Sequence, residues 1–134
     1  MIKKIIALTV LTLTQPSFAK STDILIPGGT IDAASMFPIT VSKLIPFVRY
    51  NLNCSLINPN EKAIVFVIAN KGSRLTIPYL DNVFLNGQAK LTPGTHELKL
   101  ENVTQYESEI LLVNADEQNS MLLDSCVAVA DENV

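Results

Sequence analysis

A single histidine, His96, limits the acid–base chemistry that this 134-residue chain can carry. Histidine is the usual general base for an activated serine, and the members of such a triad need only meet in the fold. No serine of the chain lies in a G-x-S-x-G motif, and His96 alternates with Leu98 and Leu100 along one predicted strand. We therefore predict no catalytic residue, with a small exported hydrolase that uses His96 as the alternative.

The acidic residues do not form a metal or cofactor motif. The loop 114–119 follows the first positions of a calcium loop, but Asn119 and Ser125 stand where that motif requires glycine and a bidentate acid. A zinc site would need more cysteine and histidine ligands than the chain contains. Glycine-rich phosphate loops are also missing. We expect neither a metal site nor a cofactor.

Cys54 and Cys126 are the only cysteines of the chain. They are too far apart for the C-x-x-C spacing of a redox site, and two thiols are too few for a structural zinc site. The sequence therefore predicts a structural disulfide, which links an early strand to the last one. The bridge would lie either across the two sheets or between neighbouring edges.

Residues 1–19 have the organisation of a cleavable signal peptide. Two lysines precede an apolar stretch at 5–14, which is about half the length of a transmembrane helix, and the segment ends in Ser-Phe-Ala. We predict cleavage after Ala19 and a single exported domain at 20–134, in the periplasm or outside the cell. No later segment is long and apolar enough to predict a membrane span in the mature chain.

Apolar and polar residues alternate with a period of two through most of the mature chain, which is typical of strands with one buried face. The run 63–69 is apolar throughout and predicts a central strand covered on both faces. Leu75, Ile77 and Tyr79 are expected to share an inward face. Strands are predicted at 23–26, 47–57, 63–69, 74–79, 96–100, 109–114 and 121–130.

Turn signals separate these runs. Asn86-Gly87 predicts a type I′ hairpin, and the segment 92–95 predicts a type II turn. The only helical turn expected lies at 32–36. Asp124 shares the strand parity of Cys126, so we predict a bulge or an exposed edge that keeps this carboxylate out of the core.

About seven to nine short strands in one domain predict an all-β fold, an antiparallel β-sandwich of immunoglobulin-like architecture. The tryptophan and the tyrosine corner of true immunoglobulin domains are missing, because the chain has no tryptophan and Asp124 stands two residues before Cys126. A small closed β-barrel is the structural alternative.

Apolar residues also gather in a proline-punctuated stretch between the first strand and the long one. They either cover one end of the sandwich or form an exposed protein-binding surface. These residues are Met36, Phe37, Ile39, Leu44, Ile45 and Phe47.

The formal net charge of −3 argues against a nucleic-acid-binding protein, which needs a basic face. We predict a non-enzymatic module that binds another protein and serves in adhesion or as an envelope accessory. Its expected binding mode is strand pairing at the sheet edges 23–26 or 121–130. A fibre or pilus subunit assembled by strand exchange is a further alternative, and it requires an open groove and a detachable N-terminal strand.

Overall fold

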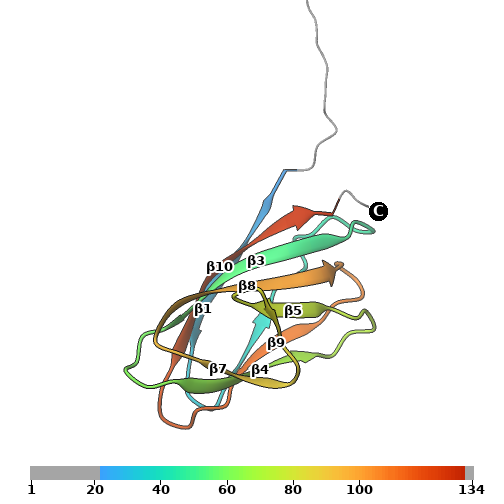
Figure 1. The fold of residues 1–134 in the computed structure, drawn as a ribbon. Helices are drawn as coiled ribbons and strands as arrows, with labels where there is room; N and C mark the ends of the chain where they lie inside the picture. Colours follow the sequence, from blue (N-terminus) through green and yellow to red (C-terminus); the bar gives the residue numbers. More distant parts are fainter. Residues whose placement is uncertain (1–21, 132–134) are drawn as a thin grey trace, which may run out of the picture.

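The computed structural model describes residues 22–131 as two antiparallel β-sheets packed face to face (Figure 1). The larger sheet has the strand order β1(Ile24–Ile31), β10(Met121–Ala130), β3(Tyr50–Asn58), β8(Gly94–Val103), β5(Ile77–Leu80), β6(Val83–Phe84). The smaller sheet has the order β2(Met36–Ile39), β9(Ile110–Asn114), β4(Ile64–Asn70), β7(Gln88–Leu91). The predicted β-sandwich is confirmed. The closed barrel is wrong, because each sheet keeps its own two edges. The predicted signal peptide lies outside the described residues.

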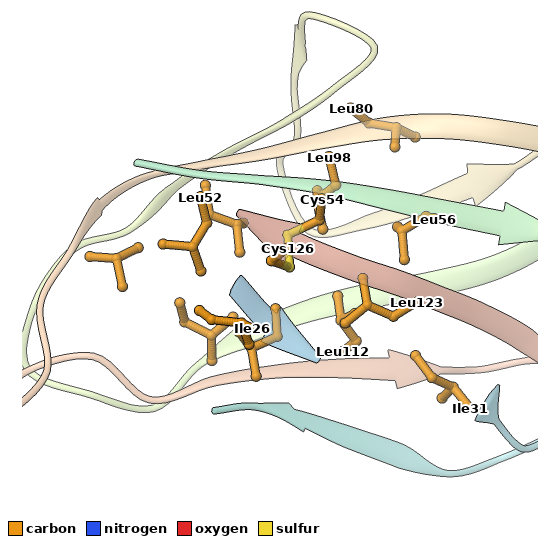
Figure 2. Close-up of a cluster of buried hydrophobic side chains, with 14 of the residues drawn as sticks. Ile26, Ile31, Leu52, Cys54, Leu56, Leu80, Leu98, Leu112, Leu123 and Cys126 are labelled. Atoms are coloured by element: carbon orange, nitrogen blue, oxygen red, sulfur yellow. A yellow bond between two sulfur atoms is a disulfide. The ribbon is translucent and has the colours of Figure 1, made fainter. Parts of the chain in front are cut away.

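The core lies between the two sheets and is built from alternate residues of the long strands. Tyr50, Leu52, Cys54 and Leu56 of β3 are all buried, as the alternation in 47–57 predicts. Each leucine that is fully removed from water in this way contributes about 1.5–3 kcal/mol to stability. Figure 2 shows the side chains of both sheets meeting in one cluster, labelled Leu52, Leu98, Leu112 and Leu123 among others.

The predicted disulfide between Cys54 and Cys126 is confirmed, and it lies inside this core (Figure 2). The two cysteines are direct partners on β3 and β10, with a Cα–Cα distance of 4.0 Å. These strands are neighbours in the interior of one sheet. The sequence led us to expect a bridge across the two sheets or between neighbouring edges. That expected position is wrong, because the bridge joins two interior strands of one sheet.

A bulge in β10 explains the position of Asp124. The pairing between β10 and β3 shifts register between Leu123 and Cys126, so both of these residues face the core while Asp124 is exposed. The predicted bulge is confirmed. Gly28 of β1 packs against the bulge so closely that an added Cβ would lie 1.8 Å from the Leu123 carbonyl oxygen.

The first strand is longer than predicted. The strand expected at 23–26 continues through Pro27 as β1, because β1 lies at the edge of its sheet, where proline is tolerated. The helical turn expected at 32–36 is instead a tight turn between β1 and β2, with Ala34 at a φ of 56°.

Two strands differ from the prediction in which of their faces are buried. The run 63–69 forms the interior strand β4, but Val65 and Val67 are only half-buried, because no layer covers the outer face of the smaller sheet. In β5, Leu80 faces the core opposite Leu98, so Leu75 points to solvent. The predicted cover on both faces and the predicted inward face are therefore wrong.

The predicted hairpin at Asn86-Gly87 is wrong. The chain there passes from β6 in one sheet to β7 in the other, and only Gly87 has a positive φ, of 84°. The two-residue hairpin lies earlier, between β5 and β6, where Asp81 and Asn82 have φ values of 50° and 68°. A type I′ turn requires a positive φ at both central residues, and asparagine and aspartate tolerate it.

A buried asparagine, Asn114, ties together the loops at the end of the sandwich opposite to the termini. Its Nδ2 donates to the carbonyl oxygens of Ile31, Asp32 and Asn119, at 3.2, 3.3 and 2.8 Å, and its Oδ1 accepts the Asp116 N–H at 3.0 Å. This side chain satisfies backbone groups of two connections that would otherwise be buried without partners.

Replacing both cysteines, C54A/C126A, is expected to destabilise the protein by about 4 kcal/mol, because the bridge closes a loop with a sequence separation of 72 residues. Urea unfolding of the double variant and the oxidised wild type measures the difference. Titration of the unreduced wild type should detect no free thiol. Two reactive thiols would contradict the assignment.

The variant N114A is expected to lose about 1–3 kcal/mol of unfolding free energy, because it leaves buried carbonyl groups without donors. N86A is the matched control, since Asn86 is exposed. Urea unfolding compares the two variants. Equal midpoints for N114A and N86A would show that the buried amide contributes nothing.

Candidate functional site

A hollow of about 570 Å³ lies at the end of the sandwich where β3 begins and where β8 and β10 end. We call it the loop-end pocket. Figure 1 shows that the start of β3 and the ends of β8 and β10 lie together at this end. Its lining comes from four segments: Phe47, Val48 and Arg49 before β3, Arg74 between β4 and β5, Thr104, Tyr106 and Glu107 between β8 and β9, and Asp131 after β10.

The backbone conformation of the turn before β3 directs the Phe47 side chain into solvent. The segment from Ile45 to Val48 forms a turn closed by the Val48 N–H, which donates to the Ile45 carbonyl at 3.3 Å. Pro46 occupies the second position and Phe47, with a φ of 67°, the third, which is the geometry of a type II turn. Glycine is preferred at this third position, and a bulky residue there is strained by about 1–2 kcal/mol. The turn nevertheless presents a phenylalanine that is 91% exposed.

Tyr106 packs against Phe47 from the opposite loop. The two rings meet edge to face, with their centroids 5.7 Å apart, and Tyr106 is 70% exposed. Such a pair contributes about 0.5–1.5 kcal/mol beyond the area that it buries. The contact orients both rings but leaves most of their surface in water. The result is an exposed aromatic pair at the rim of the pocket.

Arg74 is positioned by a bulge in β8. The pairing between β3 and β8 shifts register at this place, and Asn102 adopts a φ of 68°. Asn102 Oδ1 accepts from Arg74 Nη1 at 2.8 Å, while Asn102 Nδ2 donates to the Leu75 carbonyl at 2.7 Å. Arg74 Nε in turn donates to Glu107 Oε1 at 2.8 Å. This network fixes a guanidinium beside the aromatic pair.

Two buried polar atoms at this end have no hydrogen-bond partner among the described residues. They are Arg49 Nε, a donor, and Gln105 Oε1, an acceptor. Arg49 Nε lies 3.4 Å from Asp131 Oδ2, which is close enough for an ion pair but lacks hydrogen-bond geometry. Both atoms are buried, and Arg49 Nε is held in the ion pair with Asp131.

The structure separates the six apolar residues singled out between the first strand and the long one. Ile39 and Leu44 are buried in the core, and Phe37 packs against it from β2. Met36, Ile45 and Phe47 are exposed. Only Phe47 of the six lines the loop-end pocket. The sequence did not predict the other residues that line this pocket, such as Arg49, Arg74 and Tyr106, because they belong to no local motif.

His96 makes hydrogen bonds through both ring nitrogens. Nδ1 lies 2.7 Å from Asp81 Oδ2, and Nε2 lies 2.8 Å from the carbonyl oxygen of Thr92. A carboxylate can only accept, so Nδ1 donates to Asp81. Nε2 lies between the Thr92 carbonyl oxygen and the Thr92 hydroxyl, which is 3.2 Å away, and its role in these contacts depends on whether the ring is protonated.

The contacts of this cluster shift both pKa values. Burial alone would lower the pKa of His96, but the hydrogen bonds to Asp81 and to the Thr92 carbonyl raise it above its usual 6.5. The hydrogen bond from His96 and a second one from the Glu97 N–H lower the pKa of Asp81. The cluster ties the β5–β6 turn to the start of β8.

Residues 22–131 contain no group of three histidine, cysteine, aspartate or glutamate side chains placed to hold a metal ion. In the same residues no helix has the length and apolarity to cross a membrane. Comparisons with protein-family models, with curated proteins and with solved structures find no match for this chain.

The His96–Asp81 contact should make stability depend on pH in a defined window. A raised histidine pKa stabilises the folded state fully below about pH 6.5 and loses this effect as the pH rises through the folded-state pKa. A lowered aspartate pKa contributes above about pH 4 and is lost as the pH falls through the folded-state value.

H96Q is therefore expected to lower the melting temperature more at pH 6 than at pH 9, because the stabilisation from a raised histidine pKa is lost as the pH rises. Thermal unfolding of wild type and H96Q at both pH values measures this difference. D81N should reproduce it, because it removes the same partner. A difference that stays constant between pH 6 and pH 9 would contradict the protonated contact.

Proposed function

We propose that the protein is an exported, non-enzymatic module that binds another protein through the loop-end pocket. The observation that carries the proposal is the exposure of Phe47 from a strained turn. A phenylalanine with 91% of its surface in water gains little from its position, and its φ of 67° costs stability. The stability of the fold does not explain why a phenylalanine occupies this position, whereas binding to a partner protein does.

The composition of the pocket supports a protein partner. Tyrosine and arginine are the residue types most enriched among those that dominate protein–protein binding energy. Here Tyr106, Arg49 and Arg74 line the same pocket as the exposed ring. Loops held by a rigid sandwich are a common place for such sites.

Export is supported by two independent features. The buried disulfide is stable in an oxidising compartment, such as the periplasm or the cell exterior. The sequence of 1–19 has the organisation of a signal peptide. An adhesion or envelope accessory role fits both features.

The geometry favours this function over the two alternatives. A hydrolase that uses His96 would need an accessible ring, whereas only 14% of the His96 side chain is exposed and Nε2 lies against the carbonyl oxygen of Thr92. A strand-exchange subunit would need a detachable first strand, and β1 pairs with β10 from Ile24 to Ile31. Strand pairing through 121–130 is wrong as a binding mode, because β10 lies between β1 and β3 and has no free edge.

The variant F47G separates stability from binding. Glycine relieves the positive φ at this position but loses the ring contact with Tyr106, so we expect an unfolding free energy within about 1 kcal/mol of wild type. Binding to the partner should fall at least about tenfold. L25S is the control, because Leu25 is also exposed, at 62%, and lies on β1.

Photocrosslinking in cells of the native source identifies the partner. A photoreactive phenylalanine at position 47 should give a discrete adduct that excess wild type abolishes and excess F47G does not. The same probe at position 25 serves as the control. An adduct at position 25 only, or equal competition by F47G, would refute the proposed site.

A further inference from the structure

A second site lies on the side of the sandwich, between strand β4 and the β5–β6 hairpin. Strand β7 pairs with β4 only from Ile64 to Val67, whereas β9 pairs with β4 as far as Asn70. The segment 68–70 of β4 therefore has a neighbouring strand on one side only. On its other side the two sheets leave a hollow of about 390 Å³, which we call the side seam.

The open edge presents backbone hydrogen-bonding groups. The Lys71 N–H donates to the Glu109 carbonyl, and the Ala115 N–H donates to the Val65 carbonyl, so the odd-numbered residues of this part of β4 are those that bond to β9. In an antiparallel ladder the alternate residues direct their N–H and C=O groups to the opposite side. Ile68 and Asn70 therefore point these groups toward the side seam.

The lining of the side seam is uncharged and mostly apolar. Ile68 and Ile110 face it from the smaller sheet, and Leu75 and Phe84 stand at its rim with 72% and 56% of their surface exposed. Its remaining lining residues are Asn70, Thr76, Ile77, Pro78, Leu85 and Gly87. An occupant that matches this surface is uncharged and carries an apolar side chain.

The other sheet edges of the described residues carry features that discourage strand addition. β1 contains Pro27, β2 contains Pro38, β6 has two residues, and β7 carries the exposed Lys90. Proline, short length and lysine are the usual devices that protect an edge. The edge at 68–70 is also short, but it contains neither proline nor lysine and it borders the exposed apolar side chains of Leu75 and Phe84.

We propose that the side seam binds a short extended segment of a partner protein, which adds to β4 along Ile68–Asn70. Its backbone pairs with the open groups of Ile68 and Asn70, and an uncharged, apolar side chain enters the hollow. Alternate residues of a strand point to opposite faces, so a segment with apolar residues at every second position fits. The site adjoins the loop-end pocket at Arg74 and Leu75 but does not depend on it.

The test uses the mature chain and a capped pentapeptide, Thr-Val-Thr-Val-Thr, as the probe. Amide hydrogen exchange measured by NMR should slow by at least about tenfold at Ile68 and Asn70 when the peptide is in excess. L75S and F84S should each weaken peptide binding at least about fivefold, because each variant truncates one apolar side chain at the rim of the side seam. L25S and F47G should leave peptide binding unchanged. The test of the side seam can therefore succeed or fail independently of the proposed function of the loop-end pocket.

Four results would overturn the proposal. Unchanged exchange at Ile68 and Asn70 in millimolar peptide would exclude strand addition at this edge. Protection at β1 instead would move the site to the other edge. Concentration-dependent protection without peptide, together with a dimer in sedimentation, would assign the edge to a second copy of the chain. A peptide N-methylated at every amide should not bind, and equal binding would show an apolar hollow without backbone pairing.

Discussion

The stacking of alternate side chains between the two sheets is the constraint on which the rest of this structure depends. Strands β3, β8 and β10 each bury one face against the smaller sheet, and the disulfide joins β3 to β10 within that layer. Apolar burial is the dominant favourable contribution to folding. Because these strands are rigid and their ends are fixed, the loops that connect them are held in place without a core of their own.

The loop end combines two non-glycine residues at a positive φ with buried polar atoms that lack a hydrogen-bond partner. Phe47 occupies a turn position that favours glycine, Asn102 lies in a bulge at a positive φ, and buried atoms of Arg49 and Gln105 have no hydrogen-bond partner. Sequences tend to satisfy local rules everywhere except at functional sites. The opposite end contrasts with this one, since Asn58 and Asn114 satisfy the backbone groups around them.

The His96 cluster has a structural role that fits this division. Its ring joins Asp81, at the tip of the β5–β6 hairpin, to Thr92, just before β8. The hairpin forms one wall of the side seam, with Phe84 on β6 and Pro78 on β5. Contacts through both ring nitrogens hold the hairpin against the start of β8.

The alternating pattern of apolar residues by itself determined the strands β3, β9 and β10, the buried side of β3 and the β-sandwich class. It did so because period-two burial is a local property that survives any arrangement of the strands. The strand predicted at 47–57 begins later, at Tyr50, because the turn closed by the Val48 N–H takes up the residues before it. The cysteine pair likewise determined the bridge, since no other thiol is present.

Only the tertiary structure decided which strands are neighbours and therefore which faces and edges are open. Leu80 faces inward because it pairs with Leu98, the Asn86-Gly87 pair carries the chain between sheets, and Phe47 meets Tyr106 from a distant loop. Each of these facts rests on contacts between residues far apart along the chain, and local propensity contains no information about such partners. Apart from Phe47, the residues of both proposed sites were therefore not predicted from the sequence, because these sites consist of what the folded sheets leave uncovered.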